Sequence, residues 1–130
     1  MKKYSWLPSL CILLLALLAC GVFNRGERSG GNANTNYNTK FPLPGQVSNF
    51  TETGDGSINF QTNTSLKDTI AYYRDAFGRQ GLKERTINTA ITDTTFSMVF
   101  DGDPSGQAIV IQGVDLGNGK TNVNIRYEKV

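Results

Sequence analysis

Residues 65–82 read SLKDTIAYYRDAFGRQGL and contain the clearest helical pattern of the chain. Ser65 is a favourable N-cap, and Asp68 follows three residues later, as in the second half of a capping box. Four apolar side chains recur at helical spacing and predict one buried stripe, made of Leu66, Ile70, Tyr73 and Phe77. Gly81 is typical of a C-cap at which Leu82 folds back on Phe77. The pattern predicts a single helix of about four turns.

On both sides of this helix, apolar residues tend to recur at every second position, as in half-buried strands. Gly54-Asp55-Gly56 separates two such runs and predicts a hairpin. Residues 108–116 are apolar on both faces, which predicts a central strand. The six predicted strands are residues 47–53, 57–62, 86–92, 95–101, 108–116 and 121–129.

The order ββ-α-ββββ predicts an α+β fold, in which a helix at about residues 65–80 packs on one face of an antiparallel sheet of about 5–6 strands. A single helix covers only one face, so the opposite face carries polar side chains that alternate with the apolar ones. We expect Asn59, Gln61, Asn122 and Asn124 on that face, with Ser97 between Phe96 and Met98. These amides are candidates for hydrogen bonds to a protein or a glycan, although the face can equally be merely solvated.

The beginning of the chain has the pattern of a targeting segment. Met1-Lys2-Lys3 is positively charged, residues 7–19 are mainly apolar, and Cys20 follows directly. The apolar run is shorter than the ~20 residues of a membrane span. Its length and flanks are those of a secretory signal peptide.

Leu17-Leu18-Ala19-Cys20 resembles the lipobox of bacterial lipoproteins, in which an aliphatic residue and a small residue precede a cysteine. Leu18 is bulkier than the residue usual at its position. The resemblance implies cleavage of a signal peptide, residues 1–19, and a diacylglycerol group on Cys20, often with a further acyl chain such as palmitate. It also implies a lipid anchor in the bacterial cell membrane, facing outside the cytoplasm, with the inner and the outer membrane as open alternatives in a cell that has two. The alternatives are an uncleaved anchor helix or an ordinary signal peptide with an incidental Cys.

The residues after Cys20 divide into two parts by composition. Residues 20–40 are rich in Gly and Asn and predict a flexible tether, with a strand that orders on a partner as the alternative. Residues 41–130 predict a single α+β domain. Without Lys2 and Lys3 the chain has eleven basic and eleven acidic residues, so the charge gives no reason to expect a nucleic-acid partner.

Two motifs allow a functional and a structural interpretation. Asp101, Asp103 and Ser105 stand at the first oxygen positions of a calcium loop, with Gly106 at its bend. Gln112 replaces the glutamate that completes such a loop, and the same residues are typical of a hairpin turn, which we favour. Tyr72, on the flank of the helix, is either an aromatic platform for a ligand or a residue at the border of helix and sheet. Gly117-Asn118-Gly119 lies between two strands and predicts a turn.

The chain contains no His, which excludes His-based acid–base catalysis, His-activated nucleophiles and His metal ligands. The globular part resembles no characterised family. We therefore expect a lipid-anchored accessory or binding module outside the cytoplasm, without enzymatic activity and without a cofactor. The alternatives are a small hydrolase that uses carboxylates and a lipoprotein that binds a small ligand.

Overall fold

The structure is a computed structural model that describes residues 37–129. The predicted signal peptide, Cys20 and most of the predicted tether lie outside these residues. The elements in chain order are β1 (Val47–Glu52), β2 (Ile58–Thr62), α2 (Leu66–Arg79), β3 (Lys83–Glu84), the 3₁₀ turn η1 (Thr86–Asn88), β4 (Ala90–Ile91), β5 (Thr95–Asp101), β6 (Ala108–Gly117) and β7 (Lys120–Glu128).

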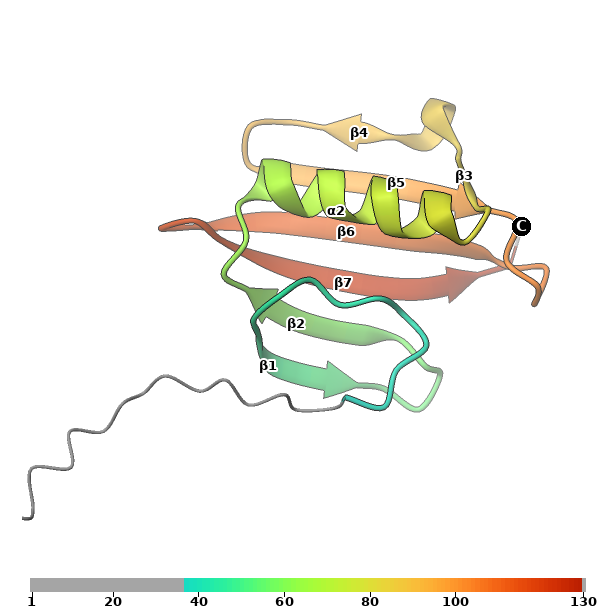
Figure 1. The fold of residues 1–130 in the computed structure, drawn as a ribbon, viewed down its shortest axis with the longest axis horizontal. Helices are drawn as coiled ribbons and strands as arrows, with labels where there is room; N and C mark the ends of the chain where they lie inside the picture. The colour runs from blue at the N-terminus through green and yellow to red at the C-terminus, as the bar shows by residue number, and fades with distance from the viewer. Residues whose placement is uncertain (1–36, 130) are drawn as a thin grey trace, which may run out of the picture. The chain divides into compact units, whose positions relative to one another are not determined.

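The strands form one antiparallel sheet with α2 packed on one face, so the predicted α+β fold is confirmed (Figure 1). The strand order is β1-β2-β7-β6-β5-β3, and β4 also pairs with β5. In the described residues the sheet has seven strands, because the short strand β3, which the sequence analysis did not predict, lies along β5 in addition to β4. β6 lies between β5 and β7, as its apolar residues on both faces predicted.

The ends of α2 form as the sequence predicts. The backbone N–H of Asp68 donates to Ser65 Oγ at 3.1 Å, and the Ser65 hydroxyl donates to the Asp68 carboxylate at 2.7 Å. At the other end, the N–H of Leu82 donates to Phe77 O at 3.0 Å, and the N–H of Gly81 donates to Gly78 O at 3.0 Å. These two bonds define a Schellman motif. Gly81 has a φ of 80°, a value that glycine adopts without strain.

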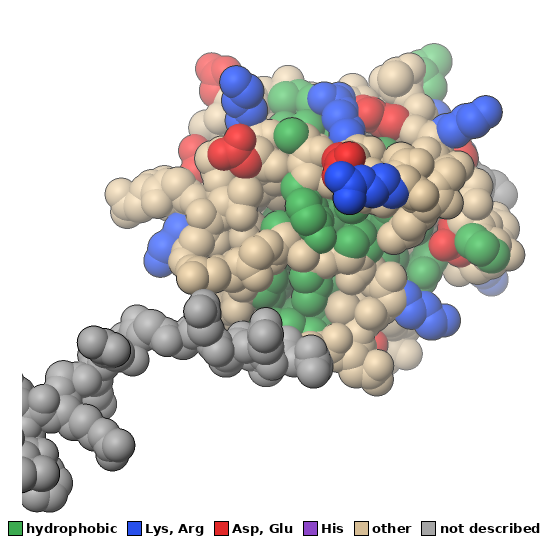
Figure 2. Space-filling model, viewed as in Figure 1, with side chains coloured by type: hydrophobic (Ala, Val, Ile, Leu, Met, Phe, Trp, Pro, Cys, Tyr) green, Lys and Arg blue, Asp and Glu red, His purple; other side chains and the backbone are tan. Residues whose placement is uncertain are grey.

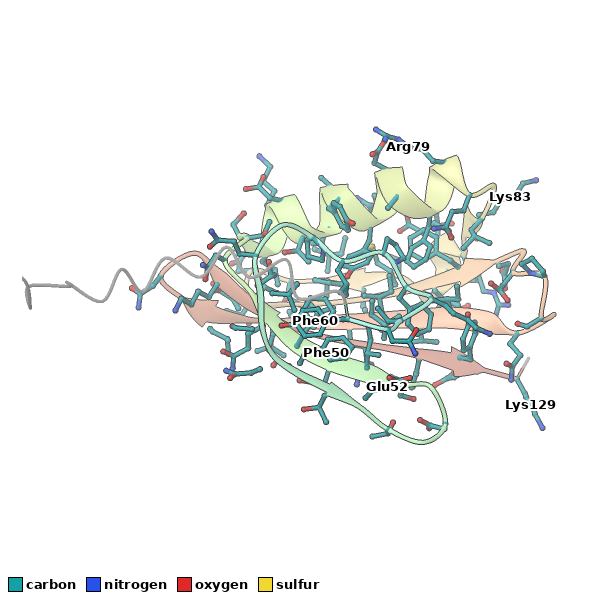
Figure 3. The ribbon with its side chains drawn as sticks, turned by 60° about the horizontal axis from the view of Figure 1, so that its bottom comes forward. Phe50, Glu52, Phe60, Arg79, Lys83 and Lys129 are labelled. Atoms are coloured by element: carbon teal, nitrogen blue, oxygen red, sulfur yellow. The ribbon has the colours of Figure 1, made fainter. Side chains whose placement is uncertain are left out.

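The hydrophobic core lies between the sheet and α2. The buried stripe of the helix meets alternate residues of the central strands, and Figure 3 shows Phe60 pointing into this layer while Arg79 points away from it. The strand residues of the core are Ile58, Phe60, Phe96, Met98, Phe100, Ile109, Ile111, Val123 and Ile125. Phe77 is 1% exposed and contacts Phe100, with 5.0 Å between ring centroids.

Residues 37–46, which we call the N-terminal strap, cover the part of the sheet beside the helix (Figure 1). The ring of Phe41 is buried and lies 4.9 Å from the ring of Tyr127. The strap is joined to α2 by two hydroxyl groups, because Tyr72 donates to Leu43 O at 2.6 Å and Tyr73 donates to Pro42 O at 3.1 Å. The irregular strap therefore completes the layer that α2 begins.

Contacts of the strap begin before Phe41, the first residue of the predicted domain. The ring of Tyr37 stacks on Phe50 at 4.2 Å, and its hydroxyl donates to Val47 O at 3.3 Å. Phe50 faces the core because β1 has an irregularity between Ser48 and Thr51. Tyr37, which the sequence analysis assigned to the tether, thus contacts the sheet.

The predicted strand over residues 86–92 forms only at its end, as β4, Ala90–Ile91, and the prediction is wrong for the residues before it. Residues 86–88 form the turn η1, Ile87 is 90% exposed, and only Ala90 and Ile91 pair with β5. The Thr89 hydroxyl donates to Glu84 Oε1 at 2.9 Å and lies 3.4 Å from Arg85 O. Such local side-chain hydrogen bonds compete with a strand ladder, so the alternating pattern of this segment does not produce a strand.

The two predicted hairpins form between β1 and β2 and between β6 and β7. Asp55 Oδ1 accepts from the Thr53 hydroxyl at 2.6 Å and from the Ser57 N–H at 3.0 Å. Asn118 and Gly119 both have positive φ, as a tight two-residue turn requires. Within residues 37–129, no helix has the length and apolar character needed to cross a membrane.

Candidate binding surface

The face of the sheet that points away from α2 carries a group of amide side chains. Strand alternation places them there, because each neighbours buried core residues along its own strand. We call this surface the amide face and define it by Asn59, Gln61, Gln112, Asn122 and Asn124. Four of these five residues are those that the sequence analysis predicted for the outer face.

The strand register brings these amides into two rows across the sheet. In one row, Asn124 of β7 lies between Asn59 of β2 and Gln112 of β6. In the next row, Gln61 lies opposite Asn122. Neighbouring strands are about 4.8 Å apart, so each row offers polar groups at regular intervals. The amide face is therefore a continuous polar surface that spans three central strands.

Arg126 fixes one side of the amide face. Its Nη1 donates to Gln112 Oε1 at 2.9 Å and to Asn124 Oδ1 at 3.3 Å, and its Nε donates to Glu128 Oε1 at 2.8 Å. Because both amide oxygens accept from the guanidinium, the amino groups of Gln112 and Asn124 are oriented away from it. The sequence analysis did not predict this role, although Arg126 has the same alternation as Asn122 and Asn124.

The remaining amides keep hydrogen-bonding groups for a partner. Gln61 Oε1 accepts from Asn49 Nδ2 at 2.9 Å. Asn59 and Asn122 make no side-chain hydrogen bond with other residues of the described range 37–129. A primary amide has two donor hydrogens and an oxygen with two lone pairs, so it can pair with peptide groups of either orientation. The amide face thus has the chemistry of a neutral hydrogen-bonding surface.

Apolar side chains adjoin the amide face along β5 and β6. Val110 is only 4% exposed, and it lies opposite Val99 on one side and Arg126 on the other. The long stem of an arginine can cover an apolar neighbour while its charged end stays in water. Val114 is 47% exposed and lies opposite Asn122. A partner on this face would therefore meet amides together with a small apolar area.

Tyr72 lies on the other side of the sheet. It is half-buried against the core, and its ring contacts Tyr73 edge to face at 5.1 Å. Burial raises the pKa of the Tyr72 hydroxyl, which donates to the carbonyl of Leu43. Tyr72 therefore lies at the border between helix and sheet, which is the second of the two alternatives that the sequence analysis gave for it.

The residues of the candidate calcium loop, for which the sequence analysis favoured a turn, have other partners. Asp101 Oδ2 accepts from Arg85 Nε at 2.8 Å, and its second oxygen pairs with Arg85 Nη2. Asp103 Oδ2 accepts from the N–H of Ser105 at 2.9 Å, and Gly106 N–H donates to Asp103 O at 2.9 Å. These are the bonds of a tight turn. In residues 37–129 no three Asp, Glu, His or Cys side chains converge on a metal-sized space.

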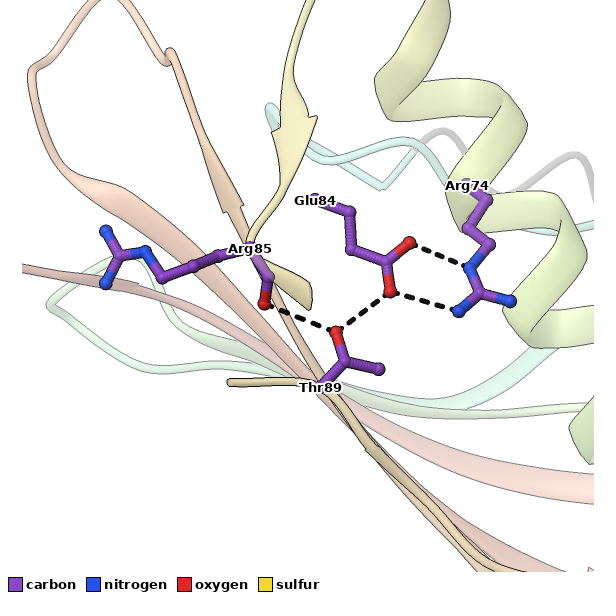
Figure 4. A network of polar contacts seen from close by, with 4 residues as sticks. All are labelled: Arg74, Glu84, Arg85 and Thr89. Carbon is purple, nitrogen blue, oxygen red and sulfur yellow. Dashed lines mark hydrogen bonds and ion pairs between the residues drawn. The ribbon is translucent and has the colours of Figure 1, made fainter. Parts of the chain in front are cut away.

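A polar network joins α2 to β3 (Figure 4). Arg74 donates to both carboxylate oxygens of Glu84, at 2.8 and 3.0 Å, and the Thr89 hydroxyl donates to the same carboxylate. The hydrogen bonds from Arg74 lower the pKa of Glu84, and the Thr89 bond adds to this effect while burial opposes it. The network connects the helix to the sheet edge, and it places no unpaired charge there.

A groove with a volume of about 990 Å³ lies between α2 and the turn after β4. Its floor is apolar and is made of Leu66, Ile70, Ala71 and Ile91, the last 46% exposed. Charged side chains line its rim, namely Lys67, Arg74, Asp75, Asp93 and Asp115. Figure 2 shows apolar side chains in the upper part of this view among basic and acidic ones. The periodicity of the sequence gave no signal for this groove, because it forms between segments distant in the chain.

Comparison of the chain with known protein families, with curated proteins and with solved structures finds no match.

Proposed function

We propose that this chain is a lipid-anchored accessory module that binds a protein partner outside the cytoplasm, through the amide face, without catalysing a reaction. The observation that carries the binding role is the pair of in-register amide rows on β2, β7 and β6. The anchoring role rests on the lipobox-like residues Leu17-Leu18-Ala19-Cys20. These two parts of the proposal are independent and are tested separately.

The composition of the amide face favours a protein over a glycan. Binding to sugar rings commonly combines hydrogen bonds with stacking on an aromatic ring. In residues 37–129, every Phe and Tyr ring belongs to the core, packs against it or, for Tyr37, stacks on Phe50. The amide face offers hydrogen-bonding groups and the exposed Val114, which suit peptide groups and small apolar side chains.

The anchor provides the location for such a module. Two or three acyl chains on Cys20, each stabilised by about 0.8 kcal/mol per buried methylene, give durable attachment to a membrane. The anchor is tested by intact-mass analysis, which should detect a chain that begins at diacylated Cys20. Cys20→Ser should abolish processing and membrane retention. Unchanged membrane association of Cys20→Ser would contradict the anchor, whatever the amide face does.

The binding role is tested with a charged variant of the amide face, Asn59→Glu combined with Asn122→Arg. The unaltered chain and the charged variant are each expressed in the native host, cross-linked in intact cells and purified from membranes. The variant should lose a cross-linked protein that the unaltered chain retains, because unpaired charges at the interface must be desolvated.

Gln80→Arg combined with Asn88→Glu is the matched control, since it introduces the same two charges at exposed positions outside the amide face. The control should retain the cross-linked protein. Equal cross-linking by both variants would contradict the use of the amide face. Retention on a glycan column that depends on Asn59 and Asn122 would favour a glycan ligand over the protein partner that we propose.

A further inference from the structure

Residues 83–93, which we call the β5 edge, lie along β5 at one border of the sheet and carry an exposed apolar residue. β3 and β4 both pair with β5, and the turn η1 between them contains Ile87, which is 90% exposed. Single exposed apolar residues are common on soluble proteins. Ile87 differs because it lies four residues before Ile91, which forms part of the floor of the groove between α2 and β4. The β5 edge therefore carries an apolar side chain and one wall of an apolar groove.

Charged side chains are ordered along the β5 edge. Lys83 lies at one end, opposite Asp101 of β5, and Figure 3 shows it pointing outward beyond the end of α2. Asp93 lies at the other end, after β4, which reaches Phe96 of β5. Asp101 and Phe96 are five positions apart, which is about 17 Å along a strand. Neither Lys83 nor Asp93 is in an ion pair with another residue of the range 37–129. The β5 edge thus has a basic end and an acidic end.

The rim of the groove adds to the negative charge at the acidic end. Two of its charged residues are paired within the chain, because Arg74 contacts Glu84 at 2.8 Å and Asp75 contacts Arg79 at 2.8 Å. The other charged residues of the rim are one basic and two acidic, namely Lys67, Asp93 and Asp115. The groove therefore suits an occupant that brings an apolar side chain to the floor and a basic side chain to this end.

We propose that the occupant is a second copy of this chain, in a two-fold dimer formed through the β5 edge. Ile87 of each protomer enters the groove of the other, and Lys83 of each protomer pairs with the partner's Asp93. A two-fold axis makes the two edges antiparallel, so the basic end of one meets the acidic end of the other in two equivalent places. The second copy fits because its β5 edge carries the apolar and the basic side chain four residues apart.

The dimer would leave both amide faces free. The amide face lies on β2, β7 and β6, and it points away from α2, whereas the dimer contact lies beyond β5 and includes α2. A dimer would therefore present two amide faces, which strengthens binding to a partner with repeated sites through effective concentration. Only this consequence rests on the proposed function, and the dimer itself is tested without reference to the amide face.

The test uses the chain from residue 20 onward with Cys20→Ser, which keeps every described residue and cannot be lipidated. In sedimentation equilibrium, its average mass should rise from that of one chain to that of two as the concentration increases. Ile87→Asp should weaken dimerisation about tenfold or more, because the new charge must be desolvated in an apolar groove. Val114→Asp is the matched control, since Val114 is a half-exposed aliphatic residue on the amide face. The control should dimerise as the unaltered chain does.

Charge reversal tests the antiparallel arrangement. Lys83→Glu and Asp93→Lys should each weaken dimerisation several-fold, because each places like charges together in both halves of the contact. The two substitutions combined should restore dimerisation, since the charges are then exchanged between the ends. Contact within one chain cannot give this rescue, because the two positions lie about 17 Å apart along the edge. Added salt should weaken the unaltered dimer, because screening weakens exposed ion pairs.

Three results would overturn the proposal. The first is the mass of one chain at every concentration. The second is dimerisation that is weakened by Val114→Asp, or that is insensitive either to Ile87→Asp or to the charge reversals, since the contact would then lie elsewhere or in another orientation. The third is growth beyond two copies, which indicates a head-to-tail contact that does not close.

Discussion

The two faces of the sheet differ in what covers them and in how they respond to substitution. One face is closed by α2 and the N-terminal strap, and its strand residues are almost fully buried. The other carries half-exposed amides held in part by Arg126. The same strands supply both faces, so the period-two pattern separates residues that stabilise the domain from residues that are available to a partner. The comparison predicts large stability losses on the first face and small ones on the second.

The largest effect is expected for Phe77→Ala on the covered face. Phe77 is 1% exposed, contacts Tyr73 and Phe100, and lies in the C-terminal motif of α2. Its truncation should lower the free energy of unfolding by about 3–5 kcal/mol. Chemical denaturation measures this change, and a loss below about 1 kcal/mol would show that the face under α2 is loosely packed.

Gly113→Ala tests the closeness of packing between β5 and β6. A Cβ atom at Gly113 would lie 2.1 Å from Cε1 of the Phe96 ring, so the ring must move. The expected loss of stability is about 1–3 kcal/mol. Gly78→Ala is the control, because its Cβ would meet nothing within 4 Å on the exposed side of α2. There the substitution should stabilise the helix by up to ~1 kcal/mol. Tolerance of alanine at both glycines would contradict the position of the Phe96 ring.

Tyr72→Phe tests whether the strap belongs to the covered face. The substitution removes the hydroxyl that donates to Leu43 O and should cost about 1 kcal/mol. Burial raises the pKa of Tyr72 above its ordinary value of 10.0. The contribution of the Tyr72 hydroxyl to the free energy of unfolding is therefore complete below pH 10. It decreases as the pH rises towards the pKa of Tyr72 in the folded state. Urea denaturation at pH 7 and at pH 10.5 measures both effects. An unchanged midpoint at pH 7 would show that the strap is held without this bond.

The sequence predicted the covered face better than it predicted the segments that lie on it. Ser65, Gly81 and the stripe that ends at Phe77 carry local signals, because caps and helical spacing depend on neighbours in the chain. The strap carries no such signal, since Pro42 and Pro44 predict extended backbone and not the surface on which it packs. The alternation around Ile87 suggested a strand, but Thr89 bonds locally to Glu84 and Arg85 instead.

The candidate surface was predictable only where it depends on neighbours in the chain. Alternation alone places Asn59, Gln61, Asn122 and Asn124 on one face. The rows that they form depend on strand order and register, which follow from pairing between distant segments. The hydrogen bonds from Arg126 and the groove beside Ile91 likewise depend on tertiary contacts. Periodicity therefore indicates which side chains share a face, and only the structure shows how they are grouped on it.

The smallest effect on stability is expected on the amide face, for Asn59→Glu combined with Asn122→Arg. Neither side chain has a hydrogen-bond partner in residues 37–129, and the two new charges lie on neighbouring strands with opposite sign. Each of these substitutions on the uncovered face should change the free energy of unfolding by no more than about 0.5 kcal/mol.

Thermal unfolding monitored by circular dichroism measures this change, with Ile58→Asn as the matched substitution on the covered face. Ile58 precedes Asn59 on β2 and is 1% exposed, so the added amide would be buried without a partner and should destabilise the domain severely. Similar losses for the charged variant and for Ile58→Asn would mean that both faces of β2 are buried, which would contradict the amide face as a surface open to a partner. A stable charged variant that also loses its cross-linked protein would separate the role in binding from the role in folding.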